Sequence, residues 1–336
     1  MDTPGHKATL KSIAEAAGVH PSTVSRALMS MPGSRIPATT VERIRRAAAE
    51  LNYAPDPWAK SLRTRRGMMV GLAIPRLTDV VLGQMFEAAQ WRARDFGYQT
   101  MTVSAENEGT ESISIKSLMD RRTDGLILAT ATLRDPLLKV IDSSGLPFVL
   151  LNRSSGAYPA VCGDDLLGGY LATKHLLDLG HVRIGHISGP TSVSTGKLRA
   201  QGYRKALREA GIEPTSDLVA PGEFDADSGI AAAETLLGLP VRPTAIFAIN
   251  DISALAAMAV ARRHGLRVPE DVAIVGYNDS EMSPLLPIPL TSVRVPLLEM
   301  GKLAVELLMK RLAGEEVGSV LLEPQVVARE SSGAAA

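Results

Sequence analysis

Three hydrogen-bonding side chains, Ser22, Ser25 and Arg26, share one face of a predicted helix that begins at Pro21. A guanidinium on an exposed helix face can donate two parallel hydrogen bonds to guanine O6 and N7, and serine hydroxyls can contact base edges. These residue types at this helical spacing therefore indicate a face that reads the major groove of DNA.

A helix, a tight turn and a second helix must position this face. Gly18 ends the first helix because glycine tolerates a left-handed backbone, and Pro21 suits the first turn of the second helix. Apolar residues of the first helix recur at i, i+3, i+4 and i+7, which predicts a buried stripe of Leu10, Ile13, Ala14 and Ala17. A third helix with an apolar face of Val41, Ile44, Ala48 and Leu51 completes a predicted all-α domain.

The distribution of charge supports a nucleic-acid partner. Residues 1–67 carry 11 lysines and arginines against 5 acidic residues, whereas the remainder carries 25 against 31, so the overall zero net charge hides a basic N-terminal region. The alternative is a small helical domain whose charges only keep it soluble. The agreement of charge, helical spacing and turn chemistry favours DNA binding.

A short basic linker follows the third helix. Pro55 and Pro57 interrupt the helical pattern, and a basic cluster ends at Gly67. Asp56 can cap a helix that starts at Pro57, but one or two turns are too short to be stable alone. We expect this segment to fold only on a partner.

This N-terminal region resembles the LacI/GalR family of bacterial transcriptional regulators. The resemblance rests on residues 9–10, 13–14, 17–19, 23–26, 51–55 and 59–62. It implies that the second helix enters the major groove and that a hinge helix inserts Leu62 into the minor groove. The alternative is that Leu62 packs under the core domain. The DNA-contacting residues it implies are Thr9, Pro21, Ser22, Thr23, Ser25, Arg26, Tyr53, Ala59, Lys60 and Leu62.

The chain departs from the family pattern at three places. His20 stands where the family often has a capping serine, so we expect a weaker start to the second helix. Asp56 replaces a frequent asparagine and puts a carboxylate near the phosphates. Pro21 and Ser22 occupy the operator-discriminating positions and neither offers a long donor, so base reading is expected to fall on Arg26.

The rest of the chain alternates apolar runs with amphipathic segments, which predicts an α/β core of two parallel-sheet lobes. Strands of the first lobe are expected at 69–74, 99–103, 125–129 and 147–151, between helices at about 82–96, 110–122 and 135–143. The second lobe is expected to hold strands at 183–187, 245–249 and 272–276 and helices near 165–179, 197–210, 227–237 and 251–264. A strand at 292–295 and a helix at about 297–313 are expected to return the chain to the first lobe.

The predicted domains are a helix-turn-helix domain (1–54), a hinge helix or linker (55–67), an effector-binding and dimerisation core (68–330) and a tail (331–336). Within the core, the first lobe takes about 68–161 and 292–321 and the second about 162–291 and 322–330. This core resembles the periplasmic-binding-protein-like core of the same family, which implies a ligand cleft between the lobes at the strand ends.

The resemblance implies seven effector-binding residues in the loops that follow the strands: Asp79, Asn152, Thr195, Arg199, Phe224, Asn250 and Asn278. Arg199 could hold hydroxyls or a carboxylate in its fork or be a solvated helix residue, and Phe224 could stack on a ring or belong to the core. Asn250 and Asn278 could also cap helices. Many sugar-binding relatives have carboxylates at the positions of Asn152 and Asn278, whereas the amides of this chain add no negative charge to the cleft. With Arg199 and Arg76 nearby, we expect the cleft to tolerate anionic ligands. We expect the effector to be a sugar or sugar derivative, followed by a sugar acid, a sugar phosphate or another small anion.

The chain lacks the motifs of the common enzyme classes. No Gly-x-Gly-x-x-Gly follows a strand, and the P-loop-like run from Gly189 to Lys197 has the wrong spacing and Leu198 where Ser or Thr is needed. The histidines have no metal-binding spacing, and Cys162 is single. We therefore expect no catalytic residue, cofactor or metal site.

A secreted or periplasmic sugar-binding protein would share the two-lobe core, but it would have no use for the basic region. The N-terminus also begins no apolar signal segment and no run is long enough to span a membrane. We predict a cytoplasmic transcriptional regulator, a repressor, that binds a pseudo-palindromic operator as a homodimer. The C-terminus has no leucine heptads, so tetramers through a coiled coil are not expected.

Overall fold

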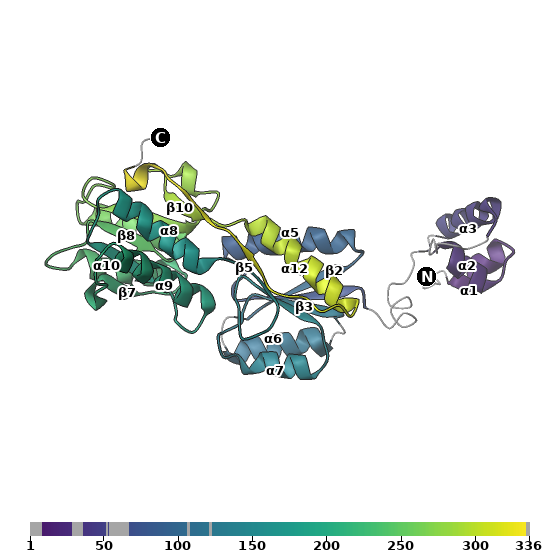
Figure 1. The fold of residues 1–336 in the computed structure, drawn as a ribbon. Coiled ribbons are helices and arrows are strands. Elements are labelled where there is room, and N and C mark those ends of the chain that lie inside the picture. The colour runs from purple at the N-terminus through teal and green to yellow at the C-terminus, as the bar shows by residue number, and fades with distance from the viewer. Residues whose placement is uncertain are drawn as a thin grey trace, which may run out of the picture. The chain divides into compact units, whose positions relative to one another are not determined.

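The computed structural model describes residues 9–28, 36–51, 53, 67–105, 108–120 and 123–333. The chain divides into two compact units, Met1–Arg65 and Arg66–Ala336 (Figure 1). The predicted hinge segment lies outside the described residues except for its last residue, Gly67. Among the described parts of the chain, no helix combines the length and apolar character needed to cross a membrane.

The first unit is the predicted three-helix domain, with α1 (Leu10–Ala16), α2 (Pro21–Leu28) and α3 (Ala38–Glu50). A small core joins the helices and includes Ile13, Val24 and Ile44 at 0% exposure. Gly18 adopts φ +62° in the turn, as the sequence predicts. Leu51, which we expected in this core, is instead 40% exposed because α3 ends one residue before it.

The second unit contains two six-stranded sheets. The first has the order β11-β5-β4-β3-β1-β2 and is parallel throughout. Its strands are β1 (Met69–Ile74), β2 (Gln99–Ser104), β3 (Gly125–Leu128), β4 (Phe148–Leu151), β5 (Ala160–Gly163) and β11 (Val320–Leu322). The second has the order β12-β10-β9-β8-β6-β7, and only the β10–β12 pair is antiparallel. Its strands are β6 (Ile184–Ser188), β7 (Val219–Pro221), β8 (Ala245–Ala248), β9 (Ala273–Asn278), β10 (Thr291–Arg294) and β12 (Gln325–Val327).

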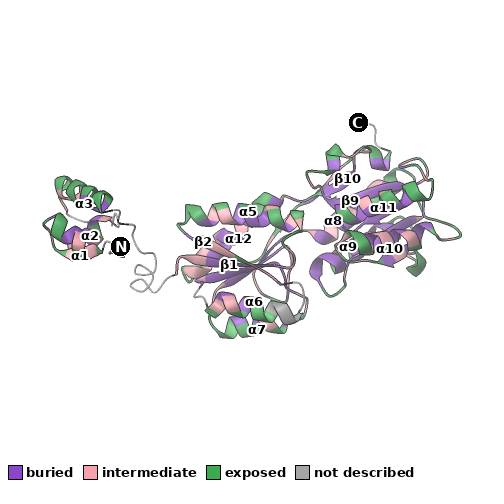
Figure 2. Ribbon diagram, turned by 180° about the vertical axis from the view of Figure 1, so that it is seen from behind, coloured by how far each residue is buried: buried purple, intermediate pink, exposed green. Residues whose placement is uncertain are grey.

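Helices cover both faces of each sheet, as a mostly parallel sheet requires. In the first lobe α5 and α12 pack together on one face, and α6 and α7 lie on the other (Figure 1). In the second lobe α8 pairs with α9 and α10 with α11. The bounds are α5 (Val80–Asp95), α6 (Glu108–Asp120), α7 (Pro136–Ser143), α8 (Asp165–Asp178), α9 (Ser194–Glu209), α10 (Ala226–Leu237), α11 (Asp251–Arg263) and α12 (Leu297–Leu312). Figure 2 shows the buried residues along the strands and the exposed ones on the outer sides of the helices.

The structure changes the predicted course of the chain between the lobes. The strand near 292–295 does not return to the first lobe, because β10 pairs with β9 and β12 in the second sheet. The chain returns to the first lobe after β10, and α12 lies in that lobe as expected, where it packs on α5. The predicted boundary at 161 falls inside β5, which belongs wholly to the first sheet. A strand pattern predicts an element but does not identify its partner in the sheet.

The predicted tail at 331–336 is also partly wrong. Glu330–Ser332 form a 3₁₀ turn, and the Ser331 hydroxyl donates to the Ile274 carbonyl at 2.6 Å. Ser331 and Ser332 are buried in the second lobe, and the last three residues lie outside the described part of the chain.

Candidate functional site

The exposed face of α2 carries the predicted base-reading residues. Ser22 and Arg26 are exposed, whereas Val24 and Ala27 are buried against the other helices. The Nε of Arg26 donates to the Ser22 carbonyl at 3.3 Å, so the guanidinium lies along the N-terminal half of the helix. The structure therefore brings Arg26 and Ser22 together on one solvent-facing surface.

The other predicted DNA contacts divide into described and undescribed residues. Thr9 is the N-cap of α1, where its hydroxyl and that of Ser12 each accept a backbone N–H in a capping box. Pro21, Thr23 and Ser25 are half-buried on α2. Tyr53 packs against the three-helix core. Ala59, Lys60 and Leu62 lie outside the described residues.

The start of α2 is better capped than the sequence predicts. The Ser22 backbone N–H donates to Nδ1 of His20 at 3.3 Å, and the Ser22 hydroxyl lies 2.8 Å from the same nitrogen. The imidazole thus supplies the acceptor that a serine hydroxyl would supply. The expectation of a weak cap is wrong because a ring nitrogen can accept a hydrogen bond as an oxygen does.

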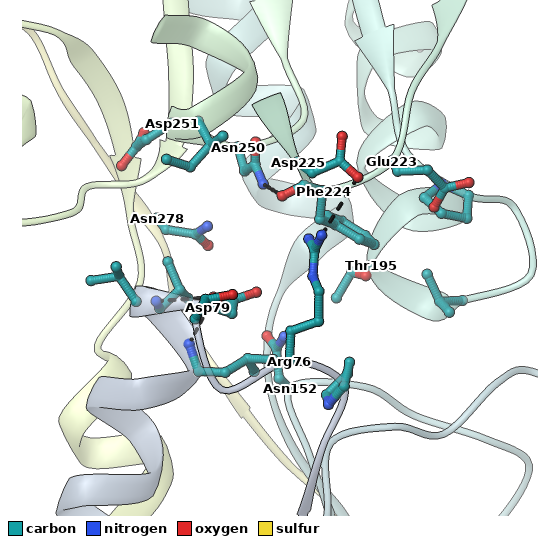
Figure 3. A pocket seen from close by; sticks show the side chains of 18 of the residues that line it. Arg76, Asp79, Asn152, Thr195, Glu223, Phe224, Asp225, Asn250, Asp251 and Asn278 are labelled. Carbon is teal, nitrogen blue, oxygen red and sulfur yellow. Dashed lines mark hydrogen bonds and ion pairs between the residues drawn. The ribbon is translucent and has the colours of Figure 1, made fainter. Parts of the chain in front are cut away.

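The seven predicted effector residues all line one cleft of about 670 Å³ between the two lobes (Figure 3). They lie at the carboxyl ends of the parallel strands or in the loops and helix turns that follow, which is where open α/β sheets bind ligands. Asp79, Asn152, Thr195, Arg199, Phe224, Asn250 and Asn278 come from both lobes.

Asn152 and Asn278 occupy corresponding places, directly after β4 and at the end of β9. Their φ angles are +67° and +101°, in the left-handed region that asparagine tolerates better than most residues. Backbone geometry therefore gives a reason for an amide at both positions that is independent of any ligand.

Two buried hydroxyls in the cleft have no hydrogen-bond partner among the described residues. Thr130 follows β3 in the first lobe and is 6% exposed, and Thr195 lies in the first turn of α9 and is 1% exposed. An unpaired buried hydroxyl costs about 1–3 kcal/mol, so each hydroxyl favours an occupant that bonds it. Sequence reasoning missed Thr130, although its position directly after a predicted strand was a usable sign.

Arg199 is a buried cation with its own counterion. Its Nε donates to the Asp165 carboxylate at 2.7 Å, its Nη1 donates to the Ile249 carbonyl at 2.7 Å, and its guanidinium stacks 3.6 Å from the Tyr277 ring centre. Burial raises the pKa of Asp165, and Arg199 opposes that rise. The solvated alternative for Arg199 is wrong, and its charge is compensated within the fold.

Asp79 and Asn250 act as helix caps at the edge of the cleft. Asp79 accepts the backbone N–H groups of Val81 and Leu82, and Asn250 accepts that of Ser253. The Asn250 amide also donates to the Phe224 carbonyl at 3.2 Å (Figure 3). Asn250 therefore both caps α11 and positions the loop that carries Phe224.

Contacts between the lobes cross the mouth of the cleft. Figure 3 shows Arg76 reaching from the first lobe toward Asp225 of the second, with 3.6 Å between Nη1 and Oδ2. The Arg153 guanidinium lies 5.8 Å from the Phe224 ring centre. Backbone contacts add to these, since the Leu133 N–H donates to the Ser192 carbonyl at 2.8 Å and the Ser154 N–H to the Ser194 hydroxyl at 2.9 Å.

The charges of the cleft do not support the predicted tolerance of anions. Arg199 is paired with Asp165 and Arg76 with Asp225, so neither guanidinium offers an uncompensated charge. The lining includes three arginines against four carboxylates: Arg76, Arg153 and Arg199, and Asp79, Glu223, Asp225 and Asp251. Within the described ranges, no three His, Cys, Asp or Glu side chains cluster as they would around a metal ion.

Comparison with known proteins identifies both units. Residues 9–56 match the family described as bacterial regulatory proteins, lacI family, and residues 173–332 match a periplasmic binding protein-like domain. The transcriptional regulator CelR of Thermobifida fusca is 37% identical over 339 residues, which cover 96% of this chain and 98% of CelR.

Solved structures of two similar regulators, CelR and the Lac repressor, cover nearly the whole chain. A complex of the transcriptional regulator CelR with cellobiose has a TM-score of 0.75 at 33% identity and covers 97% of this chain and 100% of its own. A Lac repressor dimer bound to operator and the anti-inducer ONPF has a TM-score of 0.88 at 29% identity and covers 98% and 100%.

These features define a two-lobe ligand-binding core joined to a helix-turn-helix domain. The chain belongs to the LacI family of bacterial regulatory proteins and is a DNA-binding transcriptional regulator. The predicted fold class is confirmed, and a binding protein without a DNA role is not favoured.

Proposed function

We propose that this protein is a repressor whose operator affinity is set by a neutral, hydroxyl-rich small molecule, a carbohydrate, bound in the interlobe cleft. The observation that carries the effector proposal is the pair of buried, unpartnered hydroxyls of Thr130 and Thr195, one from each lobe. A polyol bridging the two would bond both and hold the lobes together. The paired arginines support a neutral ligand.

The other cleft residues have complementary roles in this proposal. The amides of Asn152 and Asn278 can each donate and accept, which suits vicinal hydroxyls. Phe224 is half-buried beside the cleft and can stack on the apolar face of a sugar ring. Asp79, Asn250 and Arg199 shape the wall, since their charges or polar atoms already have partners in the fold.

Cellobiose is the first ligand to test, because the chain is similar over almost its whole length to a regulator named CelR and to a CelR structure solved with that disaccharide. Calorimetry compares it with glucose, with neutral pentoses and nucleosides, and with glucuronate and glucose 6-phosphate. Binding of a neutral sugar supports the proposal. Binding of the anionic compounds alone would contradict it.

On DNA, the protein acts as a homodimer on a pseudo-palindromic operator, and the similar Lac repressor is a dimer in its operator-bound structure. Arg26 reads a guanine, supported by Thr9, Pro21, Ser22, Thr23, Ser25 and Tyr53, with Ala59, Lys60 and Leu62 acting in the minor groove. Arg26→Ala should weaken binding to a selected operator by about 1–3 kcal/mol and change binding to random DNA little. An equal loss on both DNAs would reduce Arg26 to a phosphate contact.

This role places the protein in the cytoplasm, where chromosomal DNA is accessible, and makes it a binding protein with no catalytic step. The regulators it is similar to support that assignment. Incubation with cellobiose followed by chromatography of the sugar tests it, because recovery of the intact disaccharide is expected and its cleavage would contradict a binding-only role.

A further inference from the structure

His20 lies immediately before α2 at the edge of the DNA-facing surface. Both His20 and Ser22 are exposed, and Arg26 lies on the same side of α2 through its bond to the Ser22 carbonyl. The N-terminal residues of a recognition helix are the ones that reach base edges in the major groove. His20 therefore stands where a side chain can reach DNA. Its neighbours Pro21 and Ser22 offer no long donor at this place.

The hydrogen bonds of His20 fix which ring nitrogen carries the proton. A backbone N–H can only donate, so Nδ1, which lies 3.3 Å from the Ser22 backbone nitrogen, must be the acceptor. The neutral ring then carries its proton on Nε2. The Ser22 hydroxyl, 2.8 Å from Nδ1, restrains the ring further.

The resulting Nε2–H is an outward donor. No partner for Nε2 occurs among the described residues, and the nitrogen lies on the far side of the ring from Ser22. The Lys11 and Glu15 side chains line the same surface hollow as His20, on the α1 side. A donor with its tautomer already set loses less freedom on binding than a freely rotating side chain.

We infer that His20 is a second operator-reading residue, whose Nε2–H donates to a hydrogen-bond acceptor on a base edge next to the base read by Arg26. Guanine O6 and N7, adenine N7 and thymine O4 are the acceptors that the major groove offers. This inference rests on the proposed operator-binding role of α2. It gives His20 two functions, since Nδ1 caps the helix while Nε2 contacts DNA.

The test separates these functions with His20→Ser. Serine keeps a preferred N-cap side chain but removes the imidazole and its distant donor. The full-length wild type, the variant and the control Ala49→Ser, at an exposed position on α3, are each used to select duplexes from a randomised library. His20→Asn, which also keeps a capping side chain, is carried in parallel in case the serine variant fails to fold.

We expect both His20 variants to lose base preference at one position in each half-site and to bind the wild-type operator about 2- to 12-fold more weakly per half-site, with random DNA unaffected. Replacing that base pair should then cost the wild type affinity but cost the variants almost none. Unchanged base preference would make His20 a cap only, and an equal loss on random DNA would make it a phosphate contact; either result overturns the inference. Failure of the wild type to select any sequence would instead contradict the proposed function.

Discussion

Replacing Thr195 by valine should have opposite effects on stability and on ligand binding. The Thr195 hydroxyl is buried and has no partner among the described residues, so the folded protein carries its desolvation cost without a compensating bond. Valine has nearly the same shape. Thr195→Val should therefore raise the free energy of unfolding of the ligand-free protein by about 1–2 kcal/mol.

The same change should weaken effector binding. If the hydroxyl bonds the ligand, its loss removes about 0.5–1.5 kcal/mol, or about 2- to 12-fold in the dissociation constant. Urea unfolding measures the first quantity and calorimetry the second. Thr130→Val should behave in the same way because Thr130 lines the cleft in the other lobe and its buried hydroxyl is equally unpartnered among the described residues.

Thr291→Val is the matched control. Thr291 is fully buried, but its hydroxyl donates to the Arg329 carbonyl at 2.9 Å and accepts the Arg329 N–H at 2.7 Å. This substitution should destabilise the protein by about 1–3 kcal/mol. If Thr195→Val destabilises it as Thr291→Val does, the hydroxyl is satisfied within the fold and the reasoning about the cleft is refuted.

Three further perturbations test other parts of the account. Asp165→Ala should lower the free energy of unfolding by about 3–5 kcal/mol in urea, because it leaves the buried charge of Arg199 uncompensated; a loss below about 1 kcal/mol would show that the pair is not buried in solution. Burial lowers the pKa of His186 to about 4. On acidification, the unfolded chain therefore protonates this side chain near pH 6.5, whereas the folded protein protonates it only near pH 4. His186 should therefore contribute a stability loss of about 2 kcal/mol between pH 7 and pH 5, and the pH dependence of urea unfolding should be correspondingly flatter in His186→Phe; equal slopes would contradict the neutral buried ring. Arg76→Ala removes an exposed ion pair with Asp225 and should change the free energy of unfolding by less than about 1 kcal/mol. The same change should speed ligand release in stopped-flow measurements. An unchanged release rate would show that the pair does not slow the exit of the ligand from the cleft.

Periodicity predicted the helices well because each carries its own apolar stripe. The eleven helices predicted outside the hinge segment are all present among the described residues, although α9 begins at Ser194 rather than near 197. The strands β5, β7, β11 and β12 were missed; the last three have only three residues each, which is too few to show a pattern. The predicted lobe of β10 was wrong because its place in the second sheet depends on its pairing with β9 and β12, and no local sequence pattern identifies the partners of a strand.

The sequence predicted which residues line the cleft, but not how their charges are paired. The seven residues were predicted from the family resemblance and from their place in the loops after strands, and all seven line the cleft. The partner of Arg199 could not be predicted, because Asp165 is 34 residues away and meets it only when α8 packs on α9. The cap formed by His20 was missed for another reason, since residue preferences at N-caps give little weight to a ring nitrogen.

The most direct test of the central claim is the operator affinity of the full-length protein with and without a ligand bound in the cleft. Fluorescence anisotropy of a labelled, selected operator gives that affinity, and calorimetry confirms that the ligand is bound. We predict that a bound neutral sugar changes operator affinity by about 5- to 150-fold, and that Thr195→Val needs a higher sugar concentration for the same change. A sugar that saturates the cleft and leaves operator affinity unchanged would contradict it.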